Sequence, residues 1–386
     1  MPHVPDRSDW PLILLLFTAG LLAAWQFAKI SLLLPVVAIR YGSSPADVAW
    51  LVSIVGLVGI VLGAVAGNVV ASLGARRVLL FALWLGAALS AIQMVWLPIP
   101  LLALTRVLEG MSHTLIVVAA PTLIAGAASE SGRPVAMGLW AMFFGVAFAL
   151  GAVVFPPLVA RFGLDGLFLA HAVGLAWIAM IIGPLLAPQP RQRILFAPLD
   201  LHRRIYIAPN RAMPGLCFVF YTVLFVALVT LLPVALDRPG LAVSLPLLSL
   251  LGTFGAGWLS KRFPPQSVTA AGFVCTAGFA AAGWFGGTWP IFGLFTTMGL
   301  VPGACFALIP HLNRTVADQA LSTGGIAQMG NVGTTLGTPI FAAALGVGGP
   351  PTLWLGTMVI AFGGLGTLWA LSRKAANYGT ERTRVH

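Results

Sequence analysis

Long apolar stretches follow one another along the whole chain, separated mostly by short polar loops. Each has about 18 or more residues, enough for a helix to cross a hydrocarbon core of ~30 Å. They lack the alternation of a membrane β-barrel. The pattern predicts an all-α polytopic membrane protein with about twelve spans, roughly residues 11–37, 47–69, 77–96, 100–126, 135–159, 166–187, 213–236, 241–260, 267–286, 288–309, 322–347 and 351–372.

One loop is longer than the others and divides the chain close to its midpoint. Residues 188–212 have six predicted spans on each side. This loop holds five arginines, namely Arg191, Arg193, Arg203, Arg204 and Arg211. Short matches between the halves, such as Gly67 with Gly257, favour two duplicated bundles. The expected organisation is an N-terminal six-helix bundle, a basic cytoplasmic linker, a C-terminal six-helix bundle and a cytoplasmic tail, over 1–187, 188–212, 213–372 and 373–386.

The charge distribution sets the expected orientation. Charged residues make up 8% of the chain and hydrophobic ones 59%, yet the net charge is +11. The basic residues lie in loops between apolar stretches, which argues against a nucleic-acid partner. Of the 21 basic residues, sixteen fall in loops or termini on the same side of the membrane as the N-terminus. Three fall on the opposite side of the membrane, namely Arg40, Arg161 and Arg238. We expect a multi-pass protein of the cell membrane (inner or plasma membrane) with both termini cytoplasmic.

Two further features fit the same class of protein. Cys217, Cys275 and Cys305 lie inside apolar stretches, so they are expected to be packing residues and not disulfide partners. The first apolar stretch is too long for the core of a signal peptide and is interpreted as a membrane span.

The loop after the second predicted span carries a recognisable motif. GNVVASLGARR, residues 67–77, resembles the signature G-x-x-x-D-x-x-G-R-R/K of the major facilitator superfamily. Ala71 replaces the acidic residue and Ala75 is inserted before the arginines. RVLEG also resembles the fourth-helix signature of that family, with its buried arginine at Arg106. The residues that fit the loop signature are Gly67, Gly74, Arg76 and Arg77.

The resemblance implies a secondary transporter that works by alternating access. Two six-helix bundles would rock about a central cavity, and the loop signature would act as a conformational gate. A single chain in the lipid bilayer would suffice as the functional unit. Such a transporter has a small-molecule substrate and needs no cofactor or metal.

Few ionisable residues lie inside the predicted spans, and an intramembrane charge is a functional candidate by default. Arg106, Glu109 and His113 share one helix face at spacings of three and four residues. Gln26 and Lys29 share a face of the first span. At ~1.5 Å per residue, Lys29 and Arg106 reach similar depths.

Each of these candidates has an alternative structural role. Lys29 either binds substrate or extends along its stem to the membrane surface. Arg106 and Glu109 either serve transport or form a permanent ion pair. His171 is expected to be a packing residue. In the C-terminal half the polar candidates either orient the substrate or make helix–helix contacts, and they are Tyr221, Gln328 and Asn331.

The leading hypothesis is transport of a small organic anion bearing a carboxylate. Lys29 and Arg106 outnumber Glu109, so the cavity would carry surplus positive charge. Glu109 and His113 are the candidates for proton coupling. The alternative is proton-coupled export of drugs or hydrophobic metabolites. No H-E-x-x-H, G-x-S-x-G or P-loop motif is found, which argues against an enzyme.

Overall fold

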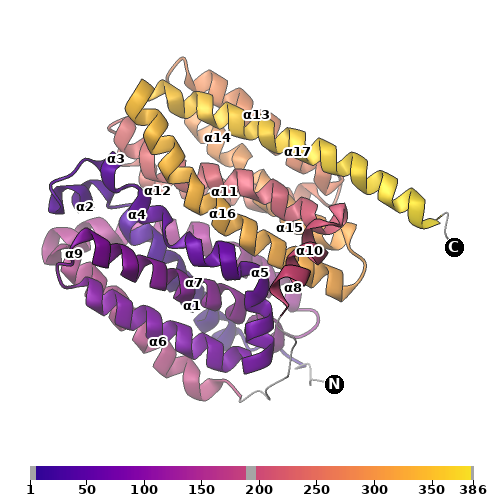
Figure 1. The fold of residues 1–386 in the computed structure, drawn as a ribbon, viewed down its shortest axis with the longest axis horizontal. Helices are drawn as coiled ribbons and strands as arrows, with labels where there is room; N and C mark the ends of the chain where they lie inside the picture. Colours follow the sequence, from indigo (N-terminus) through magenta and orange to yellow (C-terminus); the bar gives the residue numbers. More distant parts are fainter. Residues whose placement is uncertain (1–5, 188–196, 384–386) are drawn as a thin grey trace. The chain divides into compact units, whose positions relative to one another are not determined.

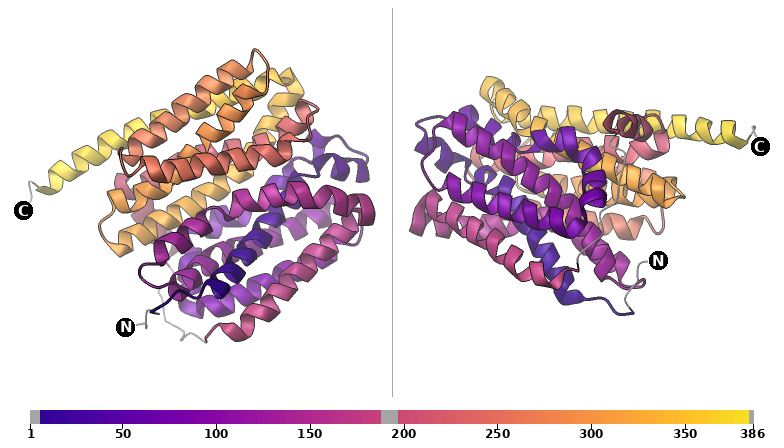
Figure 2. Two further views of the ribbon diagram at one scale, coloured as in Figure 1. Left: turned by 180° about the vertical axis from the view of Figure 1, so that it is seen from behind. Right: turned by 60° about the horizontal axis from the view of Figure 1, so that its bottom comes forward.

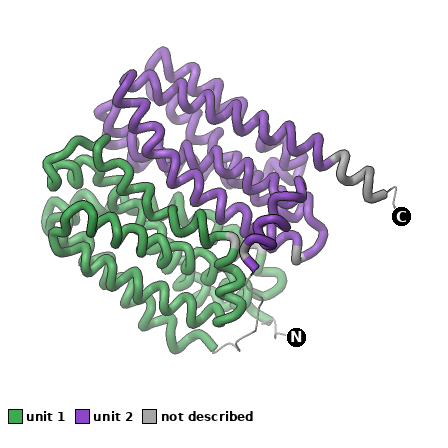
Figure 3. Tube along the Cα trace, viewed as in Figure 1, with its two compact units in different colours: residues 1–196 green, residues 197–386 purple. Residues whose placement is uncertain are grey.

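The computed structural model describes residues 6–187 and 197–383, and every regular element in these ranges is a helix (Figure 1). The chain forms two compact units (Figure 3): unit 1 is residues 1–196 and unit 2 is residues 197–386.

Unit 1 is a bundle of long helices interrupted by short ones. Its helices are α1 (Trp10–Ser31), α2 (Leu34–Arg40), α3 (Pro45–Val48), α4 (Trp50–Ser53), α5 (Gly56–Leu73), α6 (Ala75–Gln93), α7 (Ile99–Ala127), α8 (Arg133–Ala141) and α9 (Phe143–Leu185). In the interior, α1 packs against α7 and α9, and α6 packs against the same two helices.

Unit 2 has a similar make-up. Its helices are α10 (Pro198–Tyr206), α11 (Pro209–Ala235), α12 (Leu241–Leu259), α13 (Pro265–Gly283), α14 (Trp289–Met298), α15 (Leu300–Leu312), α16 (Val316–Gly348) and α17 (Pro351–Thr383). The most extensive helix pair is α11 with α16. The last part of α17 extends beyond the other helices of this unit (Figures 1 and 2).

All twelve predicted stretches lie over helices. In the described part of the chain, nine helical segments are long and apolar enough to cross a membrane. One of them is α9, in which Gly163 has a φ of 69° and separates the fifth and sixth predicted spans. The two remaining stretches correspond to α13 and α16, which are too polar to meet the same hydropathy criterion.

The segment expected to be a linker is partly helical. Of residues 188–212, those after 196 form α10 and the start of α11, and α10 packs against α16 and α11 within unit 2. Residues 188–196, with Arg191 and Arg193, lie outside the described residues. The expected tail, 373–386, continues α17 as far as Thr383.

Local sequence explains several helix ends. Gly74 has a φ of 90°, a left-handed conformation that glycine adopts without strain, and it separates α5 from α6. The Asp9 carboxylate accepts from the Leu12 N–H and caps α1. Thr315 caps α16 in the same way, by accepting from the Asp318 N–H.

A glycine on α7 permits the contact that shapes the centre of unit 1. A Cβ at Gly110 would overlap the carbonyl oxygen of Val55, at the break between α4 and α5. Near this close approach Arg106 Nε of α7 donates a hydrogen bond to the Leu51 carbonyl of α4 at 3.2 Å.

Gly110→Ala is therefore expected to lower the melting temperature of the purified protein, because the helices must separate to admit the methyl group. Gly126→Ala is a matched control on the same helix, where a Cβ would meet nothing within 4 Å. There alanine should be neutral or stabilising, by up to about 1 kcal/mol. Equal melting temperatures for the two variants would contradict the tight contact between Gly110 and Val55.

Candidate functional site

Lys29 lies in the interior of unit 1 with no exposed surface. Its Nζ donates to Ser90 Oγ at 3.1 Å, Gln93 Oε1 at 2.7 Å and Glu109 Oε1 at 2.5 Å. An ammonium group has three N–H donors, so these acceptors satisfy it completely. The side chain is thus held inside the bundle and does not extend to the membrane surface.

Glu109 is the carboxylate shared by both buried cations. Its Oε1 accepts from Lys29, while its Oε2 accepts from Arg106 Nη1 at 2.5 Å and Gln93 Nε2 at 2.8 Å. Three donors around one carboxyl group favour the ionised form, which is an acceptor only. The Arg106–Glu109 pair expected from the helical spacing is present, and Lys29 joins it. The three residues together carry one surplus positive charge.

One nitrogen of the Arg106 guanidinium has no partner among the described residues. Its Nε donates to the Leu51 carbonyl, and its Nη1 donates to the Gln26 carbonyl at 2.5 Å as well as to Glu109. Its Nη2 is buried and has no hydrogen-bond partner among the described residues. Unpaired buried donors are rare because they lose their hydration without replacement.

Gln26 extends the polar interior toward α6. Its Nε2 donates to Ser112 Oγ at 2.9 Å, and Ser112 in turn donates to the Ala82 carbonyl at 2.7 Å. The Gln26 Oε1 is buried and, within the described ranges, lacks a hydrogen-bond donor. Unit 1 therefore contains both an unpaired cationic donor and an unpaired acceptor near its charged centre.

His171, expected to be a packing residue, borders this cluster. Its Nε2 lies 2.9 Å from the Leu22 carbonyl, and its Nδ1 lies 3.1 Å from Ser90 Oγ and 3.5 Å from Lys29 Nζ. Ser90, Gln93 and His171 were not among the predicted site residues. The available signal was the spacing of Ser90 and Gln93, which places two polar side chains on one face of an otherwise apolar helix.

His113 does not join the cluster, although the spacing places it on the face of Glu109. Its Nδ1 donates to the Ala23 carbonyl at 3.0 Å, and its ring packs edge-on against Phe27 at 4.9 Å. No hydrogen bond links it to Glu109 in the described part of unit 1. A spacing of four residues would allow contact, but the Ala23 carbonyl and the Phe27 ring hold the His113 side chain instead.

The polar candidates of unit 2 are dispersed. Tyr221 lies 3.2 Å from Ser249 Oγ, and Asn331 donates to the Ala327 carbonyl of its own helix at 2.9 Å. Gln328 contacts α10 instead, since its Oε1 accepts from the Tyr206 hydroxyl and its Nε2 bonds His202 Nε2, both at 2.7 Å. Burial raises the pKa of Tyr206 to about 12, which keeps this donor protonated.

The loop signature ties two helices of unit 1 together. Arg76 donates from Nε and Nη2 to the Gly183 carbonyl at 3.3 and 3.0 Å, in the last turn of α9, where the helix dipole favours a cation. Arg77 caps the Leu73 carbonyl at 3.4 Å. A Cβ at Gly67 would meet nothing within 4 Å, so packing within the unit does not require this glycine.

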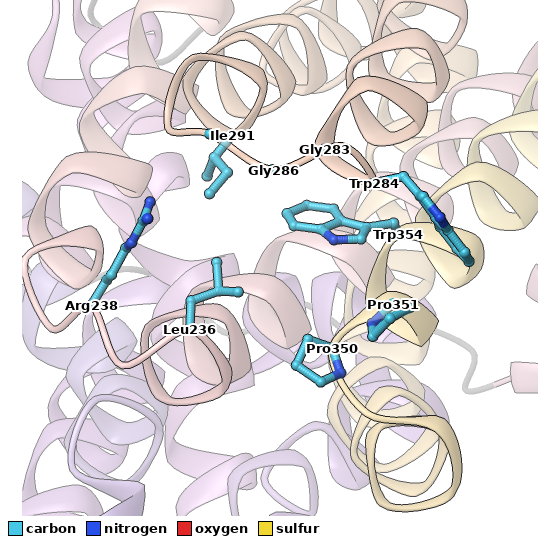
Figure 4. Close-up of a pocket in the computed structure, with 10 residues that line it drawn as sticks. Leu236, Arg238, Gly283, Trp284, Gly286, Ile291, Pro350, Pro351 and Trp354 are labelled. Carbon is cyan, nitrogen blue, oxygen red and sulfur yellow. The ribbon is translucent and has the colours of Figure 1, made fainter.

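A cavity of about 240 Å³ lies in unit 2, away from all of these residues (Figure 4). It is formed where α11 and α13 end and α17 begins, and its walls include Leu236, Arg238, Trp284, Ile291, Pro351 and Trp354. Arg238 donates to Thr288 Oγ1 at 3.1 Å. None of the sequence-predicted site residues lines this cavity.

Comparison with known proteins identifies the family. The family model of the Major Facilitator Superfamily matches residues 16–329 of this chain. The chain belongs to this superfamily. The structure of a bacterial homologue of the human lysosomal transporter Spinster, inward-facing and unoccupied, has a TM-score of 0.70 and 14% identity. That alignment covers 95% of this chain and 98% of the other, and at this identity it shows the fold alone.

A curated relative matches a smaller part of the chain. The multidrug efflux pump LfrA of Mycolicibacterium smegmatis is 28% identical over 190 residues, which are 49% of this chain and 37% of that protein. The family match confirms the predicted resemblance, the all-α membrane fold and the assignment as a transporter. The chain is thus a multi-pass membrane protein of a family of transporters.

Replacing the shared carboxylate should destabilise unit 1. Glu109→Gln leaves Lys29 and Arg106 buried without their counterion, and breaking such a cluster typically costs about 3–5 kcal/mol. The measurement is thermal unfolding in detergent, with Glu130→Gln at an exposed position as the control. If both variants melt like the parent, Glu109 does not hold the cluster together.

Proposed function

We propose that this chain transports a small organic anion bearing a carboxylate, as a secondary transporter that works by alternating access. The observation that supports this proposal is the buried cluster of two cations and one carboxylate, in which Arg106 Nη2 lacks a hydrogen-bond partner within the described residues.

Surplus charge in a membrane interior is energetically unfavourable, so it favours an anion nearby. A carboxylate oxygen would accept from the free Arg106 donor, and charge-assisted hydrogen bonds of this type are strong. Lys29 contributes by its charge, because its own donors are occupied by Ser90, Gln93 and Glu109.

The remaining predicted residues have subordinate roles in this proposal. Gln26 would hold a donor group of the substrate at its unpaired Oε1. Tyr221 and Asn331 would orient the substrate after releasing their present partners. Gln328 would respond only indirectly to substrate binding, because its side chain is bonded to α10. Arg76 would contribute to gating by linking the start of α6 to the end of α9.

Export of drugs or hydrophobic metabolites is the second candidate. It is favoured by the similarity to LfrA, whose name describes a multidrug efflux pump. Lys29 and Arg106 would oppose a cationic drug, so this alternative predicts neutral or anionic compounds. The two candidates therefore differ in whether a carboxylate is required for binding.

Ligand-induced stabilisation distinguishes them. Small carboxylates such as pyruvate and benzoate should raise the melting temperature of the parent, because a ligand that binds only the folded state stabilises it. Lys29→Met removes the surplus charge and should abolish this shift, whereas the exposed Lys261→Met should retain it. Stabilisation by lipophilic cations alone, in parent and variants, would contradict anion transport and favour the alternative.

We also propose that both termini and the segment 188–212 face the cytoplasm of a cell with this protein in its inner or plasma membrane. The asymmetry of sixteen basic residues against three supports this orientation. Cysteines introduced at exposed Asp6 and Arg204 should react with a membrane-impermeant maleimide only after cell lysis. A cysteine at exposed Arg161 is the control that should react in intact cells.

Labelling of the Asp6 or Arg204 position in intact cells would contradict this orientation.

A further inference from the structure

We propose that His171 is the residue that binds a proton together with the transported anion. The inference rests on the proposed anion transport and adds the coupling ion and the residue that carries it. Glu109 and His113 are the other candidates for binding the proton. The hydrogen bonds of the three side chains show which of them can accept a proton.

The tautomer of His171 follows from its partners. A carbonyl oxygen can only accept, so Nε2, at 2.9 Å from the Leu22 carbonyl, must carry a hydrogen. In the neutral ring Nδ1 then has a free electron pair, which faces Ser90 Oγ and Lys29 Nζ. This electron pair is a proton acceptor in contact with the charged cluster.

Protonation of Nδ1 loses no hydrogen bond. The new N–H would donate to Ser90 Oγ at 3.1 Å, while the Ser90 hydroxyl donates onward to the Phe168 carbonyl at 3.0 Å. The Nε2–H bond to Leu22 stays intact. In this step one N–H bond forms with a proton from solution, no other bond breaks, and the ring becomes an imidazolium.

The neighbouring groups are less suited to this step. A proton on Glu109 would displace one of the three donors that its two oxygens accept. Lys29 and Arg106 are already cationic. His113 donates from Nδ1 to the Ala23 carbonyl and packs between phenyl rings, so protonation at its other nitrogen would not change a hydrogen bond of the cluster.

The cost of protonation is electrostatic, and it couples the proton to the anion. The charged groups around His171 are Lys29 on α1 and Arg106 and Glu109 on α7, while α6 presents the uncharged Ser90 and Gln93. An imidazolium 3.5 Å from the Lys29 ammonium adds a second surplus charge. A bound anion compensates it, so each ligand favours the other by the same factor.

The expected consequence is symport of one proton with one monovalent anion. Without an anion His171 stays neutral, and at high pH the anion binds weakly because its proton is missing. Pyruvate and benzoate are suitable probes because both remain ionised from about pH 6 to about pH 8, a range in which an imidazole can titrate. Any pH dependence of their binding then arises from a titrating group of the protein and not of the probe.

The experiment measures the dissociation constants of pyruvate and benzoate across this pH range for the parent, His171→Gln and His113→Gln. The dissociation constant of the parent should rise by about tenfold per pH unit in the range where binding of the anion requires uptake of one proton. His171→Gln keeps a donor for the Leu22 carbonyl but cannot bind a proton, so its constants should be independent of pH. His113→Gln should behave as the parent.

Nitrogen-15 spectra of the histidine-labelled parent give a test without any substitution. They should show His171 as the Nε2–H tautomer and His113 as the Nδ1–H tautomer, and pyruvate at about pH 6 should protonate His171 alone. An unchanged pH slope in His171→Gln, or a neutral His171 at saturating pyruvate, overturns the inference and leaves anion binding intact. If neither probe binds the parent at any pH, anion transport itself fails.

Discussion

A charge inside a membrane protein must find a partner, because neither lipid nor a packed helix interior solvates it. Unit 1 meets this constraint with a single carboxylate: Glu109 bonds Lys29 through one oxygen and Arg106 through the other. The positions of α1, α6 and α7 depend on this arrangement, since Gln93 also bonds both Lys29 and Glu109. The cluster thus fixes the centre of the bundle while leaving one positive charge uncompensated.

Backbone packing makes the cluster sterically possible. Gly110 lets the α4–α5 break approach α7, which brings the Leu51 carbonyl to Arg106. Gly86 on α6 has a similar function, because a Cβ there would overlap Ser112 Oγ and Gln26 Nε2. Small residues at these two crossings therefore position polar groups as well as helices. The free Nη2 of Arg106 is the one nitrogen on that side chain that this packing leaves unsatisfied among the described residues.

The sequence predicted the helical fold and its family, because span length, loop charge and a partial motif are local properties. It also predicted Lys29, Arg106 and Glu109 as exceptional, because charges are rare in apolar stretches. Their partners were less accessible to prediction. His171 lies 142 positions from Lys29, so their contact depends on how α9 packs against α1. Conversely, His113 shares a helix face with Glu109 but turns to the Ala23 carbonyl. Periodicity specifies a face, whereas tertiary packing selects the partner.

The two units differ in how they use polar side chains, and this difference restricts the mechanism. In unit 2 the threonines at 230, 269, 276 and 357 donate to carbonyls one turn earlier in their own helices, and Asn331 does the same. Bonds of this kind satisfy a polar group locally and respond little to a distant charge. In unit 1 the polar groups around Glu109 bond mainly between helices, so a change of charge at one of them alters the contacts of α1, α6, α7 and α9 together. A transporter that converts proton or anion binding into helix movement needs contacts of the second kind, and within unit 1 Glu109 makes them with α1 and α6.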